Sequence, residues 1–348
     1  MKFITKLVLL LNCCCTPFFL FSQKQEQREI ESGDAKIVLV GENHRFLDTS
    51  VQFSLIRNAL QHNHEILILL EIGYNHNYQI DSAFKVKSKS VYYSFKTNRT
   101  PDFCDLLIEY ISTYDLWGRI RIKCVDILEN RFYPINTLER FLYDNEFETK
   151  AEKIKNRAFV FPKLVRKKKL KYLYSVFEKS LREDSIKYIN KYGRKLYNEY
   201  YLNSLGAFYY LKFSKFKVST TLRDTFMYQV IKREISLDSS NIVIGTFGAL
   251  HTYKKASNKY KYQDETTIYQ KNLYYYLNGD AAYNGKIKVY KYLHVENKTD
   301  NILNYMNENG IQLIKRKCTI KPCVISTEEM RGINKELSEL ADYFIWEY

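Results

Sequence analysis

Four short apolar segments, each followed closely by titratable residues, constrain the fold of this chain more than any other feature. The segments are residues 37–40, 66–70, 120–125 and 242–244. The residues that follow them are Glu42 and His44, Glu71, Asp126, and His251. Each segment has the length and character of a buried strand, and ligands of open α/β sheets bind beyond the carboxyl ends of the strands. The pattern therefore predicts an enzyme with a polar site at one edge of a sheet, rather than a scaffold.

Amphipathic segments separate the first three apolar runs. Residues 48–61 and 102–117 carry apolar side chains at helical spacing. The order strand, helix, strand, helix, strand predicts right-handed crossovers and a parallel sheet. The fold class is therefore α/β, with a mostly parallel central sheet and flanking helices. We also expect strands over 286–293 and near 311–314, and a closing helix from Thr327.

The domain organisation follows from the same pattern. Residues 137–235 hold few strand signals and many charged and aromatic residues, which predicts a long helical insertion between the third and fourth strands. We expect a flexible leader over 23–35 and one α/β domain over 36–300. Residues 301–348 are expected to form a C-terminal extension packed on the core.

The first 22 residues indicate the compartment. The chain begins with basic residues, continues with an apolar run over 7–21 and then becomes polar. This order is typical of a secretory signal peptide. An uncleaved N-terminal anchor is the alternative. The sequence therefore predicts an exported protein: periplasmic, associated with the envelope, or secreted.

The chain is basic, with 54 Lys and Arg against 39 Asp and Glu, a net charge of +15. The excess accompanies a general richness in Lys, Asn, Ile and Tyr, so it does not predict a nucleic-acid partner. The densest basic run is 166–171. It is either a solvated helix face, which we favour, or a surface that associates with anionic lipid or an acidic partner at the envelope.

Four cysteines remain after the N-terminal segment, and their spacing matches no zinc site. They are Cys104, Cys124, Cys318 and Cys323. In an oxidising compartment Cys318 and Cys323 are able to pair, and the sequence leaves that open.

Two histidines at strand ends, beside carboxylates, allow two kinds of chemistry. His44 or His251 is suited to act as a general base toward water, with a carboxylate fixing its tautomer. Alternatively, two histidines and one carboxylate form an open metal site. Arg223 and Asp224, in an Arg-Asp-x-x-Met motif, would direct a guanidinium at a carboxylate or oxyanion, or would form an ordinary charge pair within a helix.

The order of these motifs resembles the superfamily that joins erythromycin esterase-like hydrolases, Tiki/TraB-type metalloproteases and ChaN-type haem-binding proteins. The likeness covers roughly residues 36–130 and 220–255. It implies an α/β core with an active site at the strand ends, partly covered by the helical insertion. Esterase-like members usually place two residues between the Glu and His of the first motif, whereas Gly41-Glu42-Asn43-His44 has one, which is closer to the other two branches.

The resemblance assigns roles residue by residue. His44 is the expected base, Glu42 and Glu71 orient groups or polarise water, and Arg223 and His251 complete the catalytic set. The expected supporting residues are Asp126, Asp224 and Arg45. In a metal-dependent branch His44, Glu71 and His251 would hold a divalent metal. In a haem-binding branch Tyr74 would be the haem ligand.

These observations give three hypotheses for function. The first is an exported hydrolase that activates water against an ester or amide bond of a small-molecule or peptide substrate. No Gly-x-Ser-x-Gly motif is present, so covalent serine catalysis is not expected. The second is a haem- or metal-binding uptake protein that uses the same pocket without catalysis. The third is an inactive relative that associates with the envelope through 166–171.

Overall fold

The computed structural model describes ten stretches of the chain. They are residues 34–42, 49–94, 102–127, 138–160, 165–212, 220–237, 240–254, 271–294, 308–318 and 323–347. The predicted signal peptide, nearly all of the predicted leader, His44 and Arg45 lie outside these residues.

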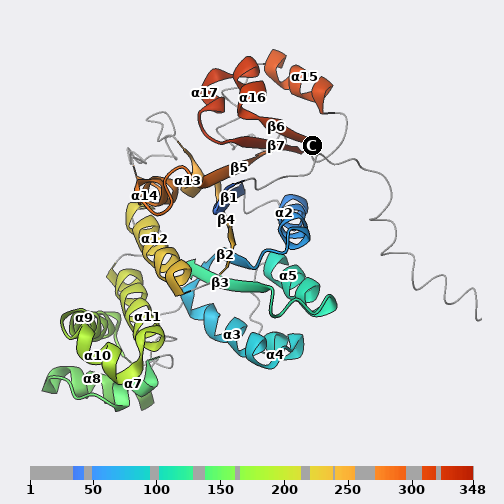
Figure 1. Ribbon diagram of the computed structural model, residues 1–348. Coiled ribbons are helices and arrows are strands. Elements are labelled where there is room, and N and C mark those ends of the chain that lie inside the picture. The colour runs from blue at the N-terminus through green and yellow to red at the C-terminus, as the bar shows by residue number, and fades with distance from the viewer. Residues whose placement is uncertain are drawn as a thin grey trace, which may run out of the picture. The chain divides into compact units, whose positions relative to one another are not determined.

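A seven-stranded sheet runs through the described residues in the order β3-β2-β4-β1-β5-β7-β6 (Figure 1). The strands are β1 (Ile37–Glu42), β2 (Ile66–Gly73), β3 (Ile120–Asp126), β4 (Ile242–Gly248), β5 (Ile287–His294), β6 (Cys323–Ser326) and β7 (Tyr343–Glu347). All neighbouring strands are parallel except β6 and β7. Because β4 lies between β1 and β2, the carboxyl ends of the four strands predicted to carry the site meet at one edge. The α/β fold with a mostly parallel sheet is confirmed.

Helices cover both faces of this sheet, which explains why the central strands are continuously apolar. On one side lie α2 (Ser50–Gln61) and α5 (Asp102–Thr113), and on the other lie α12 (Thr220–Leu237) and α14 (Leu273–Gly279) (Figure 1). Leu67 and Leu69 of β2 share a hydrophobic cluster with Phe226 of α12. Side chains alternate along a strand, so Glu71 points to the same side as these leucines, toward α12.

Several helices fill the predicted insertion between β3 and α12. They are α7 (Glu139–Tyr143), α8 (Thr149–Val160), α9 (Lys167–Glu183), α10 (Ser185–Tyr192) and α11 (Arg194–Lys212). Fully buried aromatic side chains, such as Phe141 and Phe177, hold them together. The basic run opens α9, where Lys167, Lys168 and Lys169 are exposed. Across the described residues, no helix has the length and apolar character that a membrane crossing requires.

The end of the chain differs from the sequence expectation. Residues 311–314 belong to a helix, α15 (Glu308–Lys317), and not to a strand. In that segment Ile314 is fully buried while Leu313 is half exposed, which is the pattern of a helix with one face on the core. The predicted closing helix is α16 (Thr327–Ile333), followed by α17 (Lys335–Ser338) and then β7, which the sequence analysis missed. Cys318 and Cys323 form a disulfide between α15 and β6.

The remaining short elements flank β2 and β4. The turn η1 (Tyr74–His76) follows β2 directly and leads into α3 (Asn77–Val86) and α4 (Lys89–Ser94). One helical turn, α13 (Ala249–Thr252), follows β4 and carries His251.

Candidate functional site

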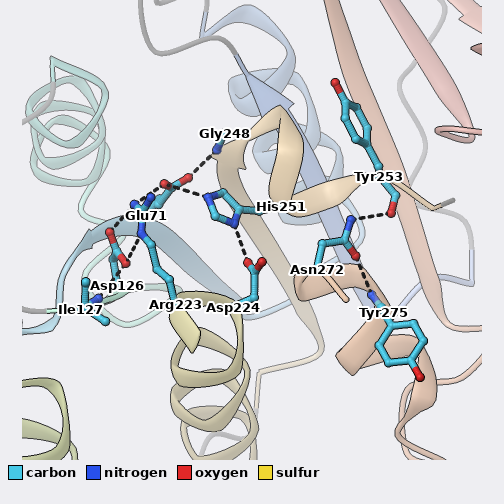
Figure 2. Close-up of polar contacts among 10 residues, drawn as sticks. All are labelled: Glu71, Asp126, Ile127, Arg223, Asp224, Gly248, His251, Tyr253, Asn272 and Tyr275. Carbon is cyan, nitrogen blue, oxygen red and sulfur yellow. Dashed lines mark hydrogen bonds and ion pairs between the residues drawn. The ribbon is translucent and has the colours of Figure 1, made fainter. Parts of the chain in front are cut away.

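Five titratable side chains meet at the carboxyl edge of the sheet (Figure 2). Glu71 ends the straight part of β2, and Asp126 is the last residue of β3. His251 lies in α13, just beyond β4. Arg223 and Asp224 lie in the first turns of α12, where consecutive side chains point about 100° apart. Arg223 consequently faces β2 and β3, and Asp224 faces His251.

Arg223 joins two of the carboxylates. Its Nε donates to Oδ1 of Asp126 at 2.7 Å, and its Nη2 donates to Oδ2 of Asp126 and Oε1 of Glu71. Paired bonds from one guanidinium to one carboxylate fix both groups in a plane. In the described part of the chain Nη1 makes no hydrogen bond, and 29% of the Arg223 side chain is exposed. One donor group of the guanidinium is therefore held in a fixed position without a partner among the described residues.

Glu71 is the centre of the cluster. Its side chain is 3% exposed. Its Oε2 accepts a hydrogen bond from the backbone N–H of Gly248 at 2.5 Å, while Oε1 accepts from Arg223 and lies 3.4 Å from Nε2 of His251. Both carboxylate oxygens are thus held, and Glu71 ties the ends of β2 and β4 to α12.

His251 is buried and oriented by Asp224. Its Nδ1 lies 2.5 Å from Oδ1 of Asp224, and its Nε2 points toward Glu71. Burial alone would lower the pKa of His251, but the carboxylates of Glu71 and Asp224 outweigh it and raise the pKa to about 10. The imidazole therefore carries a proton on each nitrogen at neutral pH.

The charge balance of the cluster accounts for that proton. Three carboxylates share the cluster with one guanidinium, whose pKa they raise further. With a neutral imidazole the cluster would hold two uncompensated negative charges in a buried place, and protonation of His251 leaves one. Burial raises the pKa of Asp224, and the neighbouring imidazolium opposes that effect.

The structure brings together five of the predicted site residues. They are Glu71, Asp126, Arg223, Asp224 and His251. Glu42 ends β1 in register with Gly248, and its carboxylate accepts from Nε2 of Gln52 in α2 at 3.4 Å. His44 and Arg45 lie outside the described residues, so their roles stay predictions.

The cluster does not fit a resident metal ion. The guanidinium of Arg223 occupies the carboxylate oxygens that a cation would need, and Nδ1 of His251 is already bonded to Asp224. Within the described stretches, no group of three or more His, Cys, Asp or Glu side chains is arranged to hold a metal. The predicted set of Glu71, His251 and His44 includes a residue outside those stretches and stays a prediction.

Tyr74 does not fit the role of haem ligand. It is 5% exposed and lies in η1 beside a small polar pocket. Burial, with help from nearby carboxylates, raises the pKa of its hydroxyl well above the ordinary range. Because a tyrosine binds haem iron as the phenolate, this environment disfavours ligation.

Sequence reasoning missed two groups near the site, the backbone N–H of Gly248 and the buried side chain of Lys291. The N–H of Gly248 is a partner of Glu71 that only a three-dimensional arrangement reveals. Lys291 of β5 lies in register with Gly41 and is 1% exposed, and its Nζ donates to the hydroxyl of Tyr253 at 2.6 Å. Nothing in the surrounding sequence distinguishes Lys291 from the exposed lysines of the chain.

Comparison with known proteins identifies the fold. No protein-family model matches the chain, and no curated protein matches it in sequence. A variant of erythromycin esterase EreC in its open conformation is 15% identical, with 90% of this chain and 91% of that chain covered and a TM-score of 0.67. A Bacillus cereus protein is also 15% identical, with 90% and 88% covered and a TM-score of 0.60. A succinoglycan biosynthesis protein is 12% identical, with 93% and 91% covered and a TM-score of 0.60. The chain therefore has the α/β fold of the erythromycin esterase-like proteins.

Proposed function

We propose that this protein is a hydrolase that activates water against an ester or amide bond at the carboxyl edge of its sheet. The observation that carries the proposal is the buried His251, fixed through Nδ1 by Asp224 and directed through Nε2 at Glu71. A histidine held in this way by carboxylates is typical of hydrolytic sites. The fold shared with a protein named an erythromycin esterase supports the same reaction class.

In this proposal the positive groups stabilise the negative charge that develops on the attacked carbonyl oxygen. Arg223 offers its unused Nη1, and the imidazolium of His251, whose pKa is raised to about 10 and whose N–H groups face Asp224 and Glu71, adds positive charge. Donors that are fixed before the reaction stabilise such an oxyanion without reorganising. His251 then serves as a charged donor, and not as the base that takes a proton from water.

The base in this proposal is His44, assisted by Glu42 at the end of β1. Glu42 pairs in register with Gly248, whose N–H holds Glu71, so β1 and the cluster share one edge of the sheet. In this proposal His44 removes a proton from water, and the proton on Nε2 of His251, which faces Glu71 in this structure, passes to the oxygen or nitrogen that leaves. We further propose that the substrate is a small molecule or a peptide. We also propose that residues 1–22 direct export of the protein.

The test is an activity screen of the full-length chain and three variants. The substrates are nitrophenyl esters, lactones and peptide amides. Each is assayed with and without a chelator. His44→Ala and His251→Asn are expected to abolish turnover, and His62→Asn, whose exposed side chain lies in the turn after α2, is the matched control. Full activity in His44→Ala and His251→Asn on a substrate that the parent hydrolyses would exclude the proposed mechanism. Activity that the chelator removes would favour the metal-dependent alternative.

A further inference from the structure

A pocket that is separate from the charged cluster opens at the outer edge of β3. Its volume is about 250 Å³, and its walls come from η1, α3, β3, α11 and α12. β3 is the last strand on its side of the sheet, with α3 packed beside it (Figure 1). We call this cavity the β3-edge pocket. Its volume is below the 300–1,000 Å³ usual for pockets that hold larger ligands, so its ligand is small.

Two acceptors beside the pocket have no hydrogen-bond partner among the described residues. The hydroxyl of Tyr74, a residue 5% exposed, makes no hydrogen bond in the described part of the chain. Asn203 is 2% exposed, and while its Nδ2 donates to the backbone oxygen of Glu199, its Oδ1 is buried without a partner. Buried polar atoms are nearly always bonded, so Oδ1 of Asn203 beside this cavity indicates a missing donor.

A carboxylate without a hydrogen-bonded or ion-paired partner adds to these acceptors. Among the described residues Glu199 forms no side-chain hydrogen bond and no ion pair, although it is half-buried. Burial raises the pKa of Glu199, while the charges of Lys123 and Lys195 partly offset that effect from a distance. Nζ of Lys123 is bonded to both oxygens of Asp81, at 2.8 and 2.9 Å. Arg121 is directed at Ser240, with Nη2 and the hydroxyl 3.2 Å apart. The same carboxylates act on Tyr74. Burial raises the pKa of its hydroxyl most, and the negative charges of Glu234 and Glu199 raise it further.

The backbone of β3 contributes a further acceptor. The side chain of Asn77 bonds both the N–H and the C=O of Cys124 at the outer edge of the strand, at 2.7 and 2.8 Å. Residues two apart in a strand direct their backbone groups to the same side, so Ile122 presents its carbonyl to the pocket that it lines. The rings of Tyr74 and Phe84 supply an apolar wall.

We propose that the β3-edge pocket binds a small primary ammonium compound. The ammonium group donates to the Glu199 carboxylate and the Tyr74 hydroxyl oxygen, and the alkyl part lies along the rings of Tyr74 and Phe84. An ammonium group has three donors and a charge, which suits several acceptors and one unmatched carboxylate. An inorganic cation would leave the apolar wall uncovered, and within the described residues no metal-binding group is found. This proposal does not depend on the proposed hydrolase activity.

The test is calorimetric titration of the full-length chain at low salt with three probes of equal size. Butylammonium is expected to bind with a Kd on the order of 1 mM, while butyrate and butanol are expected to give no saturable heat. Glu199→Gln should weaken butylammonium binding at least tenfold, and Tyr74→Phe should weaken it severalfold. Glu183→Gln, which changes an exposed carboxylate at the end of α9, is the matched control. Glu199→Gln removes an unpaired charge, so it should melt no lower than the parent.

Three results would overturn the proposal. These are the absence of saturable binding by butylammonium, equal binding of butyrate, and unchanged affinity in Glu199→Gln. The His251→Asn variant separates this inference from the proposed reaction, since it should bind butylammonium as the parent does. Reduced affinity in His251→Asn would show that the probe occupies the charged cluster instead.

Discussion

The protonation of His251 should make the stability of the folded protein depend on pH in an unusual window. The pKa of His251 is raised to about 10 in the folded protein, against about 6.5 for histidine in an unfolded chain. A raised folded-state pKa contributes stability that is fully present below the unfolded-state pKa. That stability is lost as the pH rises through the folded-state pKa. The folded protein should therefore lose stability between neutral and alkaline pH through this one group.

The magnitude follows from the two pKa values. Linkage gives a contribution of about 4–5 kcal/mol at about pH 6, about 2–3 kcal/mol at about pH 8, and less than about 1 kcal/mol at about pH 10. No discount for solvent is needed, because the His251 side chain is only 7% exposed. The contribution is comparable to a large part of the 5–15 kcal/mol that stabilises a typical domain, so it is measurable.

The assay is urea unfolding of the parent and His251→Asn at these three pH values. Asparagine keeps a hydrogen-bond donor for Asp224 but cannot titrate. The parent-minus-variant difference in unfolding free energy should fall by about 2 kcal/mol from about pH 6 to 8, and by a similar amount from about pH 8 to 10. His62→Asn, which removes an exposed histidine in the turn after α2, is the control variant measured in parallel. A difference for His251→Asn that is flat, or that changes only around pH 6–7, would refute the reasoning.

Three further predictions concern the same cluster and the strand beneath it. Asp224→Asn should lower kcat by about 10²-fold or more with little change in KM, because His251 loses its orienting acceptor and its charge. Steady-state kinetics that show an effect on KM alone would contradict this. Arg223→Met should lower the unfolding free energy by about 3–5 kcal/mol, because it leaves Glu71 and Asp126 buried without their cation. Arg223→Lys should lower it less. Equal losses for the two variants in urea unfolding would argue against the role of the two-pronged guanidinium. Gly245→Ala should cost about 1–3 kcal/mol, because the added carbon would lie 2.3 Å from Cε2 of Phe247, whereas Gly118→Ala adds its carbon in open space and should be neutral in thermal melting.

The sequence was sufficient for the central strands and for five titratable residues that the structure brings together. β1, β2 and β4 are apolar runs buried on both faces, and such runs differ from amphipathic helices in the sequence itself. The strand-end positions of Glu71 and Asp126 then follow from where those runs stop. The pairing of Asp224 with His251 could not be predicted, because it depends on how α12 docks across the sheet, 27 positions away in the chain.

The C-terminal region shows where local patterns fail. Ile311 and Ile314 are β-branched, which favours a strand, yet their spacing of three also suits one face of a helix, and packing selected the helix α15. The five residues of β7 become a strand by pairing with β5, about fifty positions earlier. A strand this short, stabilised by a distant partner, has little local signal to predict it.

The same reasoning explains why residue types predicted the site but not its protonation state. A histidine at a strand end is a candidate base only if its pKa stays near neutrality, and the number of carboxylates that surround it in space cannot be read from the order of residues. Around His251 there are two carboxylates in contact and a third joined through Arg223. One guanidinium cannot neutralise three carboxylates, so the imidazole takes up the second positive charge. In the proposed reaction the base would therefore be a different group, and for that reason the proposal gives the proton-accepting role to His44.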